Sequence, residues 1–161
     1  MSIKKKLVHI YYFRYFHNKN IHIGKDFSCR KRLIRKSVDG GKIKIGNHCW
    51  FNNGCSVYSR REISFGDNVL IGENVHFYDH NHVFNLEGKL IGESGFQIQP
   101  IHIGNNVWIG TNCVILAGTT IGDGSVIGAG CVVSGNIPPH SVVKSTNQYI
   151  VENIRYKGKK E

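Results

Sequence analysis

The feature that most constrains the fold is an aliphatic residue that recurs every six positions in the second half of the chain. The recurring residues are Ile103, Ile109, Ile115, Ile121, Ile127 and Val133. A period of six matches neither the 3.6-residue period of an amphipathic helix nor the turn spacing of ordinary hairpins. It fits a short strand followed by a corner, with three hexapeptides completing one coil. Stacked coils then pair as parallel strands about 4.8 Å apart, and the aliphatic side chains form one continuous core.

A second track of smaller residues runs beside the first, four positions after each aliphatic residue. Its members are Val107, Cys113, Thr119, Ser125 and Cys131. Earlier segments repeat the aliphatic pattern in two other phases, at Ile45, Phe51, Val57 and Ile63, and then at Phe65, Ile71 and Phe77. The change of phase predicts a small corner insertion near residues 59–64. We expect the first coil to begin at Ile21, and the basic, irregular stretch from Cys29 to Gly41 to be a bulged coil.

The composition supports this interpretation. The chain has 19 glycines and 3 prolines, which favours many tight turns over a helical bundle. Its five cysteines include no CxxC pair, so the sequence predicts neither a disulfide framework nor a zinc ribbon. Four of them, at positions 49, 55, 113 and 131, fall on the small-residue track and are predicted to fill the core. No apolar run is long enough to span a bilayer, which predicts a cytoplasmic protein.

Charge divides the chain into three parts. Residues 1–44 carry 13 Lys and Arg against 2 Asp and Glu, residues 45–143 carry 3 against 7, and residues 144–161 carry 5 against 2. We therefore expect a basic, aromatic cap at 1–20, a β-helix at 21–143 and a basic tail at 144–161. Residues 3–16 are predicted to be a helical cap over the open end of the β-helix. The alternative is peripheral membrane contact through Lys4, Lys5 and Lys6 at the inner face of a membrane.

Several phrases of the sequence resemble the hexapeptide-repeat acyltransferases. They are GDNVLIGENV at 66–75, DHNH at 79–82, the run from Pro100 to Gly130, and NIPPHSVV at 136–143. The resemblance is strongest to the galactoside and maltose O-acetyltransferases and to relatives that acetylate bacterial capsule and lipopolysaccharide sugars. It implies an all-β fold, a left-handed parallel β-helix.

The resemblance also implies an activity. It implies an O-acetyltransferase that moves an acetyl group from acetyl-CoA to a sugar hydroxyl in bacterial surface polysaccharide synthesis, without a metal. An N-acetyltransferase acting on an amino sugar or other amine is an alternative. A zinc enzyme of the β-helix carbonic anhydrase type is a weaker one, because His76, His80, His82 and His102 fit its ligand spacing poorly. The last alternative is a non-enzymatic scaffold or a nucleic-acid binder. The basic ends would permit the latter, but no nucleic-acid-binding motif accompanies them.

The repeat is interrupted by a long loop at 78–100, and loops of that length inside a compact repeat are usually functional. A histidine there can act as general base, accepting the proton of the attacking hydroxyl. Counted without a gap from GDNVLI, His82 falls on the position of the family's catalytic histidine. His80 is expected to line the acceptor pocket. Asp79 is expected to orient a ring nitrogen and so fix the tautomer.

The resemblance also assigns acceptor contacts. Asn52 aligns with a family asparagine that hydrogen-bonds sugar hydroxyls, and Trp50 lies beside it. The family's acidic acceptor contact falls on Arg60. Together with Arg61, this basic residue predicts an acceptor that carries negative charge, such as an acidic glycan or a lipid diphosphate-linked sugar.

The donor is expected to lie in the groove between neighbouring subunits of a homotrimer. The residues that the resemblance assigns to acetyl-CoA are Trp108, Gly110, Thr111, Gly128, Ala129 and Ser134. The family's terminal basic residue falls on Tyr149. Lys144, Arg155 or Lys157 is therefore expected to meet the CoA phosphates.

Overall fold

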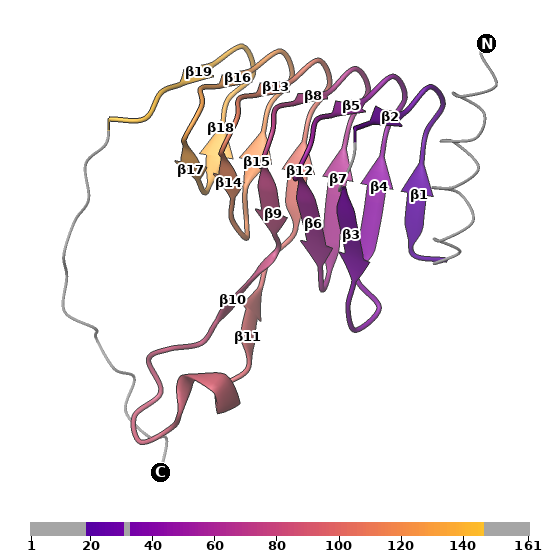
Figure 1. Cartoon of the computed structure of the whole chain (residues 1–161). Helices are drawn as coiled ribbons and strands as arrows, with labels where there is room; N and C mark the ends of the chain where they lie inside the picture. The colour runs from indigo at the N-terminus through magenta and orange to yellow at the C-terminus, as the bar shows by residue number, and fades with distance from the viewer. Residues whose placement is uncertain (1–18, 31–32, 147–161) are drawn as a thin grey trace.

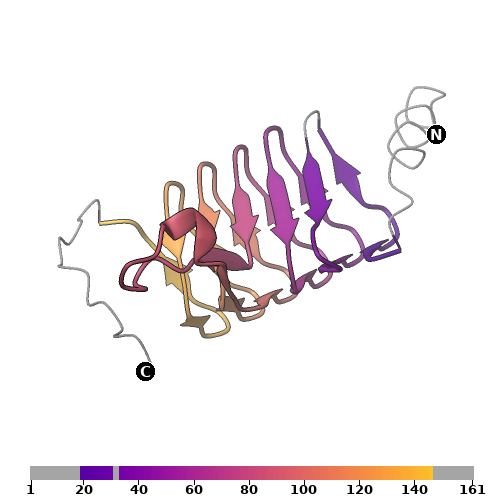
Figure 2. The same cartoon turned by 90° about the horizontal axis from the view of Figure 1, so that it is seen from below.

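The computed structural model describes residues 19–30 and 33–146, which form a parallel β-helix of three sheets that run along its length (Figures 1 and 2). The predicted all-β class of stacked, parallel hexapeptide coils is confirmed. The predicted cap at 3–16, and the tail beyond residue 146, lie outside the described residues. Within the described residues, no helix is long and apolar enough to cross a membrane.

Each of the first five coils contributes one strand to each sheet, and the last coil contributes a strand to the first and second sheets. The first sheet contains β1 (Ile21–Ile23), β4 (Lys42–Ile45), β7 (Glu62–Phe65), β12 (Ile101–Ile103), β15 (Thr120–Ile121) and β18 (Asn136–Ile137). The second contains β2 (Ser28–Cys29), β5 (Trp50–Phe51), β8 (Leu70–Ile71), β13 (Trp108–Ile109), β16 (Val126–Ile127) and β19 (Val142–Val143). The third contains β3 (Ile34–Ser37), β6 (Ser56–Ser59), β9 (His76–Tyr78), β14 (Val114–Ile115) and β17 (Val132–Val133).

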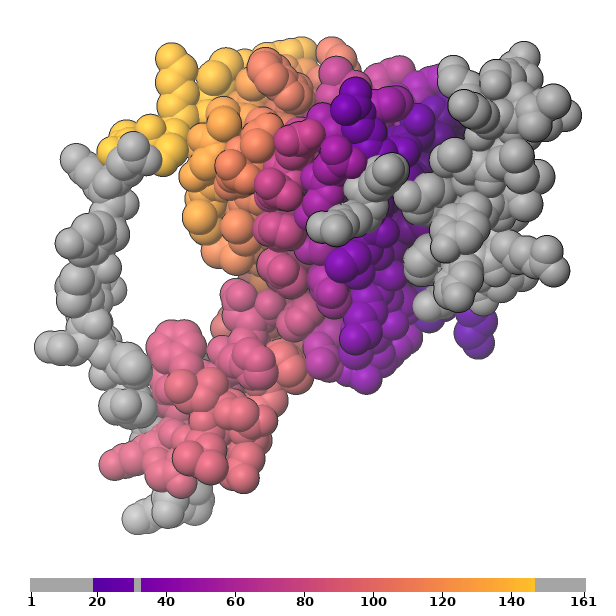
Figure 3. Space-filling view, viewed as in Figure 1, coloured from indigo at the N-terminus to yellow at the C-terminus, as the bar shows by residue number. Residues whose placement is uncertain are grey.

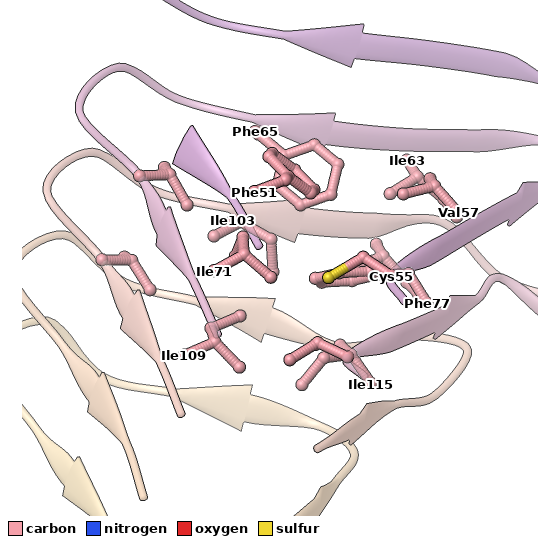
Figure 4. Close-up of a cluster of buried hydrophobic side chains, with 14 of the residues drawn as sticks. Phe51, Cys55, Val57, Ile63, Phe65, Ile71, Phe77, Ile103, Ile109 and Ile115 are labelled. Atoms are coloured by element: carbon pink, nitrogen blue, oxygen red, sulfur yellow. The ribbon is translucent and has the colours of Figure 1, made fainter. Parts of the chain in front are cut away.

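The predicted aliphatic ladder is the core of this β-helix. Every member from Ile45 to Val133 is buried, in all three phases, and so is the track of smaller residues. Phe51, Phe65 and Phe77 pack edge to face at the centre, with ring centroids 5.2 and 4.9 Å apart for the two pairs that involve Phe65 (Figure 4). Burying one such side chain contributes about 1.5–3 kcal/mol, so the ladder accounts for much of the stability.

The cysteines fill the core, as predicted. Cys49, Cys55, Cys113 and Cys131 are buried, and Cys29 is half-buried. The thiols of Cys49, Cys55 and Cys113 lie 3.1–3.2 Å from backbone carbonyl oxygens of the neighbouring coil. Burial raises the pKa of these three thiols above its ordinary value, so they stay protonated and unreactive.

The basic stretch from Cys29 to Gly41, which the sequence predicts to be a bulged coil, contains one whole strand, β3. The strand β3 pairs regularly with β6, from Ile34–Ser56 to Ser37–Ser59. The coil is nevertheless longer than a regular one, because Ile21 pairs with Ile43, 22 positions on, whereas Ile103 pairs with Ile121, 18 positions on. Part of the extra length lies in the turn at 38–41, so the coil protrudes at that corner. Arg35 occupies the position of an aliphatic core residue in this coil and is buried, which is why the hydrophobic pattern is interrupted there. At the next corner, a Cβ on Gly41 would lie 2.2 Å from the carbonyl oxygen of Ser59, so this tight stacking requires glycine.

The loop between the third and fourth coils is an arm, residues 80–98, that stands clear of the coils (Figures 1 and 3). It is an antiparallel ribbon of β10 (His80–His82) and β11 (Phe96–Ile98), with a short 3₁₀ turn η1 (Ile91–Glu93) at its tip. The arm exposes several large apolar side chains: Phe84, Leu90, Ile91 and Ile98.

Candidate active site

A fully buried carboxylate, that of Asp79, lies where β9 ends and the arm begins. It accepts hydrogen bonds from the hydroxyl of Ser59 and from the backbone N–H groups of Arg60 and Arg61, each at 2.8 Å. These donors belong to the corner between β6 and β7, where the sequence predicts an insertion. Asp79 therefore fixes the base of the arm to that corner.

The carboxylate of Asp79 also orients a histidine. Nδ1 of His80 lies 3.1 Å from Oδ1 of Asp79. A carboxylate accepts hydrogen bonds, so this contact favours the tautomer with the proton on Nδ1, in which Nε2 is the acceptor. Of the two histidines of the arm, His80 is therefore the one that Asp79 contacts. Within the described residues, the ring nitrogens of the exposed His82 make no hydrogen bond.

A phenylalanine of the arm, Phe96, lies beside both histidines. The ring of Phe96 on β11 lies 4.5 Å from the ring of His82 and 5.5 Å from that of His80, measured between centroids. The guanidinium carbon of Arg60 lies 3.8 Å from the centre of the same ring, a cation–π contact. We call Arg60, His80, His82 and Phe96 the Phe96 cluster. Sequence reasoning missed Phe96 because its contact with His82 depends on strand pairing inside the arm.

The two arginines of the corner have different surroundings. The guanidinium of Arg60 forms an ion pair with the exposed Asp39, and its side chain is 19% exposed. The side chain of Arg61 is exposed and, within residues 19–30 and 33–146, makes no ion pair and no ring contact. Of the two, only Arg60 therefore belongs to the cluster with the histidines.

Except for Ser134, the predicted donor residues lie elsewhere, on the second sheet and its edge, together with two of the predicted acceptor contacts. Strand pairing aligns the exposed Trp50, Leu70 and Trp108 on the outer face of this sheet, in line with Val126 and Val142. We call these five side chains the apolar row. Other candidates follow the strands of this sheet at one edge: Asn52, Gly110, Thr111, Gly128, Ala129 and Lys144. Ser134 follows β17 and lies at the opposite edge of the third sheet.

The glycines of this edge have a structural role. The backbone N–H groups of Gly110 and Gly128 donate to carbonyl oxygens of the next coil, at 2.7 and 2.8 Å. A Cβ on Gly110 would lie 2.7 Å from the backbone nitrogen of Ala129. These glycines therefore allow neighbouring coils to stack closely. Their backbone N–H groups already donate hydrogen bonds to the next coil.

One chain does not bring all the predicted site residues together. Asn52 precedes β6 and Arg60 follows it, so the two lie at opposite ends of a strand of the third sheet. The Phe96 cluster lies at one edge of that sheet, and the donor candidates, apart from Ser134, lie on the second sheet or at the other edge.

The histidines of the weaker zinc alternative are also separated. His76 bonds the hydroxyl of Ser56 on the third sheet, and His102 bonds that of Ser64 on the first. In the described part of the chain, no three His, Cys, Asp or Glu side chains are grouped to hold a metal ion.

The stacked hexapeptide coils and the inserted, histidine-bearing arm define a hexapeptide-repeat β-helix protein. The family model "Bacterial transferase hexapeptide (six repeats)" matches residues 100–135. A maltose O-acetyltransferase from Clostridium difficile is 31% identical, with a TM-score of 0.69, over 85% of this chain and 72% of that one. The chain belongs to the hexapeptide-repeat acetyltransferase family.

Two further relatives bear on function. The galactoside O-acetyltransferase of Escherichia coli K12 is 39% identical over 120 residues, which cover 74% of this chain and 58% of that protein. The chain thus spans less than two thirds of the length of this relative. A hexapeptide-repeat acetyltransferase from Vibrio cholerae, solved with acetyl coenzyme A, has a TM-score of 0.71 and 28% identity over 96% of this chain and 80% of that one.

Proposed function

We propose that the protein is an acetyl-CoA-dependent O-acetyltransferase whose acceptor is a sugar hydroxyl in bacterial surface polysaccharide. The observation that carries the proposal is the pair of imidazoles at the base of the arm, in a fold whose relatives are named as sugar acetyltransferases. An alcohol is a poor nucleophile at neutral pH, and a neutral imidazole can remove its proton.

His82 is the proposed general base. Its ring is exposed, packs against Phe96 and makes no hydrogen bond within the described residues, so a nitrogen is available to the acceptor hydroxyl. The acceptor oxygen bonds to the thioester carbonyl carbon as its proton passes to this nitrogen. The carbon–sulfur bond then breaks, and the imidazolium returns the proton to the thiolate of CoA. His80, held by Asp79, lines the acceptor pocket.

Acetyl-CoA is proposed to lie along the edge that follows the second sheet. The Vibrio relative was solved with this molecule, which supports the same donor here. Trp108 is 54% exposed on the adjoining face and offers an apolar surface to the donor. Lys144 is exposed at the end of the edge, where its ammonium can meet a phosphate.

A homotrimer is proposed because the two halves of the site lie at different edges of one chain. In a threefold ring, one patch of each copy meets a different patch of the next. The second sheet of one copy can therefore face the Phe96 cluster and arm of its neighbour. The apolar row and the apolar tip of the arm support such an assembly, because both expose large hydrophobic side chains.

Leu70→Glu tests the assembly. Leu70 lies between Trp50 and Trp108 in the apolar row and is 51% exposed in the single chain. A charge buried there without a partner should dissociate the trimer, and acetyl transfer should fall at least about 10-fold because the site is divided. Analytical ultracentrifugation measures the mass of the assembly, and circular dichroism verifies that the variant is folded. Thr120→Glu, on the polar outer face of the first sheet, is the matched control and should leave the mass unchanged. An active monomer would contradict the shared site.

The activity itself is tested by thiol release from acetyl-CoA with a panel of acceptors. The panel contains neutral sugars, uronic acids, amino sugars and simple amines. We expect acceptor-dependent release with a hydroxyl acceptor, and mass spectrometry should find the product raised by one acetyl group on oxygen. Transfer only to amines would support the N-acetyltransferase alternative, and no transfer to any acceptor would refute the proposed activity.

A further inference from the structure

We infer that Arg60 makes the enzyme selective for an acceptor that carries a carboxylate or phosphate beside the hydroxyl to be acetylated. The inference rests on the proposed function and specifies its substrate class. It assigns recognition of the negative charge to Arg60 and not to Arg61, a distinction that the sequence did not make.

The position of Arg60 is the first reason. Its guanidinium lies over one ring, Phe96, which also contacts both candidate base histidines. A sugar whose anionic group binds this guanidinium would therefore hold a nearby hydroxyl within reach of an imidazole. Such positioning of a reacting group is a large part of catalysis in transfer reactions.

The second reason is that Arg60 is fixed before any acceptor binds. Its backbone N–H is held by the buried carboxylate of Asp79, and its guanidinium lies against Phe96. An arginine held in place loses little conformational entropy when it binds an anion, and its planar fork matches carboxylate and phosphate geometry. Its buried Nε atom has no hydrogen-bond partner within the described residues, so part of its donor capacity is unused.

The third reason concerns the present counter-ion of Arg60. Asp39 is 67% exposed on a surface turn. Exposed ion pairs contribute only about 0–1 kcal/mol, so a carboxylate on the acceptor can replace Asp39 at little cost. A neutral sugar gains no such contact, because a hydroxyl offers the guanidinium no negative charge.

The experiment compares acceptors that differ in one group. Methyl β-glucuronide carries a carboxylate in place of the C6 hydroxymethyl group of methyl β-glucoside, and glucose 6-phosphate carries a phosphate on the C6 oxygen of glucose. Both charged acceptors therefore keep the ring hydroxyls and lack a free C6 hydroxyl, so the rates are compared for acetylation of the ring hydroxyls. We expect kcat/KM to be higher for one charged acceptor than for its neutral partner. Charge-assisted hydrogen bonds imply a preference of roughly 10- to 100-fold, and whichever charged acceptor shows it identifies the anion.

Two arginine variants then assign the preference. Arg60→Gln should lower the ratio of charged to neutral kcat/KM about 10-fold or more, whereas Arg61→Gln removes the same charge from the same corner and should leave the ratio unchanged. If the two variants lowered this ratio equally, the preference would come from the overall positive charge of the corner, and the assignment to Arg60 would be overturned. No preference in the wild-type protein would overturn the inference itself.

A binding measurement separates this inference from the proposed activity. Isothermal titration calorimetry with the same sugars, in the presence of CoA, requires no turnover. Binding of a charged sugar that Arg60→Gln weakens and Arg61→Gln does not would support anion recognition even if no acetyl group were transferred. If neither variant weakened the affinity for the charged sugar, the inference would be refuted even if the enzyme proved active.

Discussion

Replacing His82 with alanine should lower acetyl transfer by about 10²- to 10⁴-fold, which is the usual contribution of a general base. The fold should be unaffected, because the side chain is exposed on the arm and makes no hydrogen bond within the described residues. The measurement is thiol release from acetyl-CoA at saturating acceptor, with circular dichroism and sedimentation to verify fold and mass. Because the lost interaction belongs to the transition state, kcat should fall more than KM rises.

His80→Ala is the matched control for this prediction. His80 contacts the same phenylalanine and lies two residues away, but Asp79 holds one of its ring nitrogens. If His82 is the base, the loss in His80→Ala should appear mainly as a higher KM for the acceptor. The reverse ranking, with His80→Ala the nearly inactive variant, would make Asp79 and His80 the catalytic pair and would contradict the assignment to His82.

Asp79→Ala should destabilise the protein by about 3 kcal/mol, because it leaves two backbone donors without their acceptor. The donors that lose their acceptor are the backbone N–H groups of Arg60 and Arg61, whereas the hydroxyl of Ser59 can still donate to the carbonyl oxygen of Lys42, 2.9 Å away. Urea unfolding at one fixed protein concentration measures the change, since assembly contributes to apparent stability. Activity should fall as well, because the same carboxylate positions His80 and the corner that carries Arg60.

Asp39→Asn is the control for Asp79→Ala. Both carboxylates lie near the same corner, but Asp39 is exposed and Asp79 is fully buried. The exposed substitution should change the free energy of unfolding by less than about 1 kcal/mol. Equal destabilisation by the two variants would mean that the hydrogen bonds of Asp79 do not hold the corner.

Much of the fold could be predicted because a strict hexapeptide period has few solutions. The aliphatic residues from Ile45 to Val133 are buried as predicted, and the cysteines of the small-residue track fill the core. The prediction was incomplete where the composition departs from the repeat. Arg35 takes a core position in the coil that contains β3, so a basic residue interrupts the apolar pattern although β3 pairs regularly with β6.

The candidate site could be predicted only in part. The sequence located the arm and its histidines, because an interruption of a regular repeat is visible by counting. It paired Asp79 with no particular histidine, did not identify Phe96, and did not separate Arg60 from Arg61. These three points depend on how a ribbon of two strands folds back on the corner between β6 and β7, which no periodicity describes.

The sequence by itself determined that hexapeptides stack as parallel coils, because one aliphatic side chain in six must be buried at every side of the coil. Only the tertiary structure decided which groups meet at the arm. That outcome depends on contacts between segments about 20 residues or more apart in the chain, such as Arg60 on Phe96 and Asp79 on Ser59. Local sequence constrains such contacts weakly, because their geometry is set by how the coils stack and by the direction in which the arm leaves them.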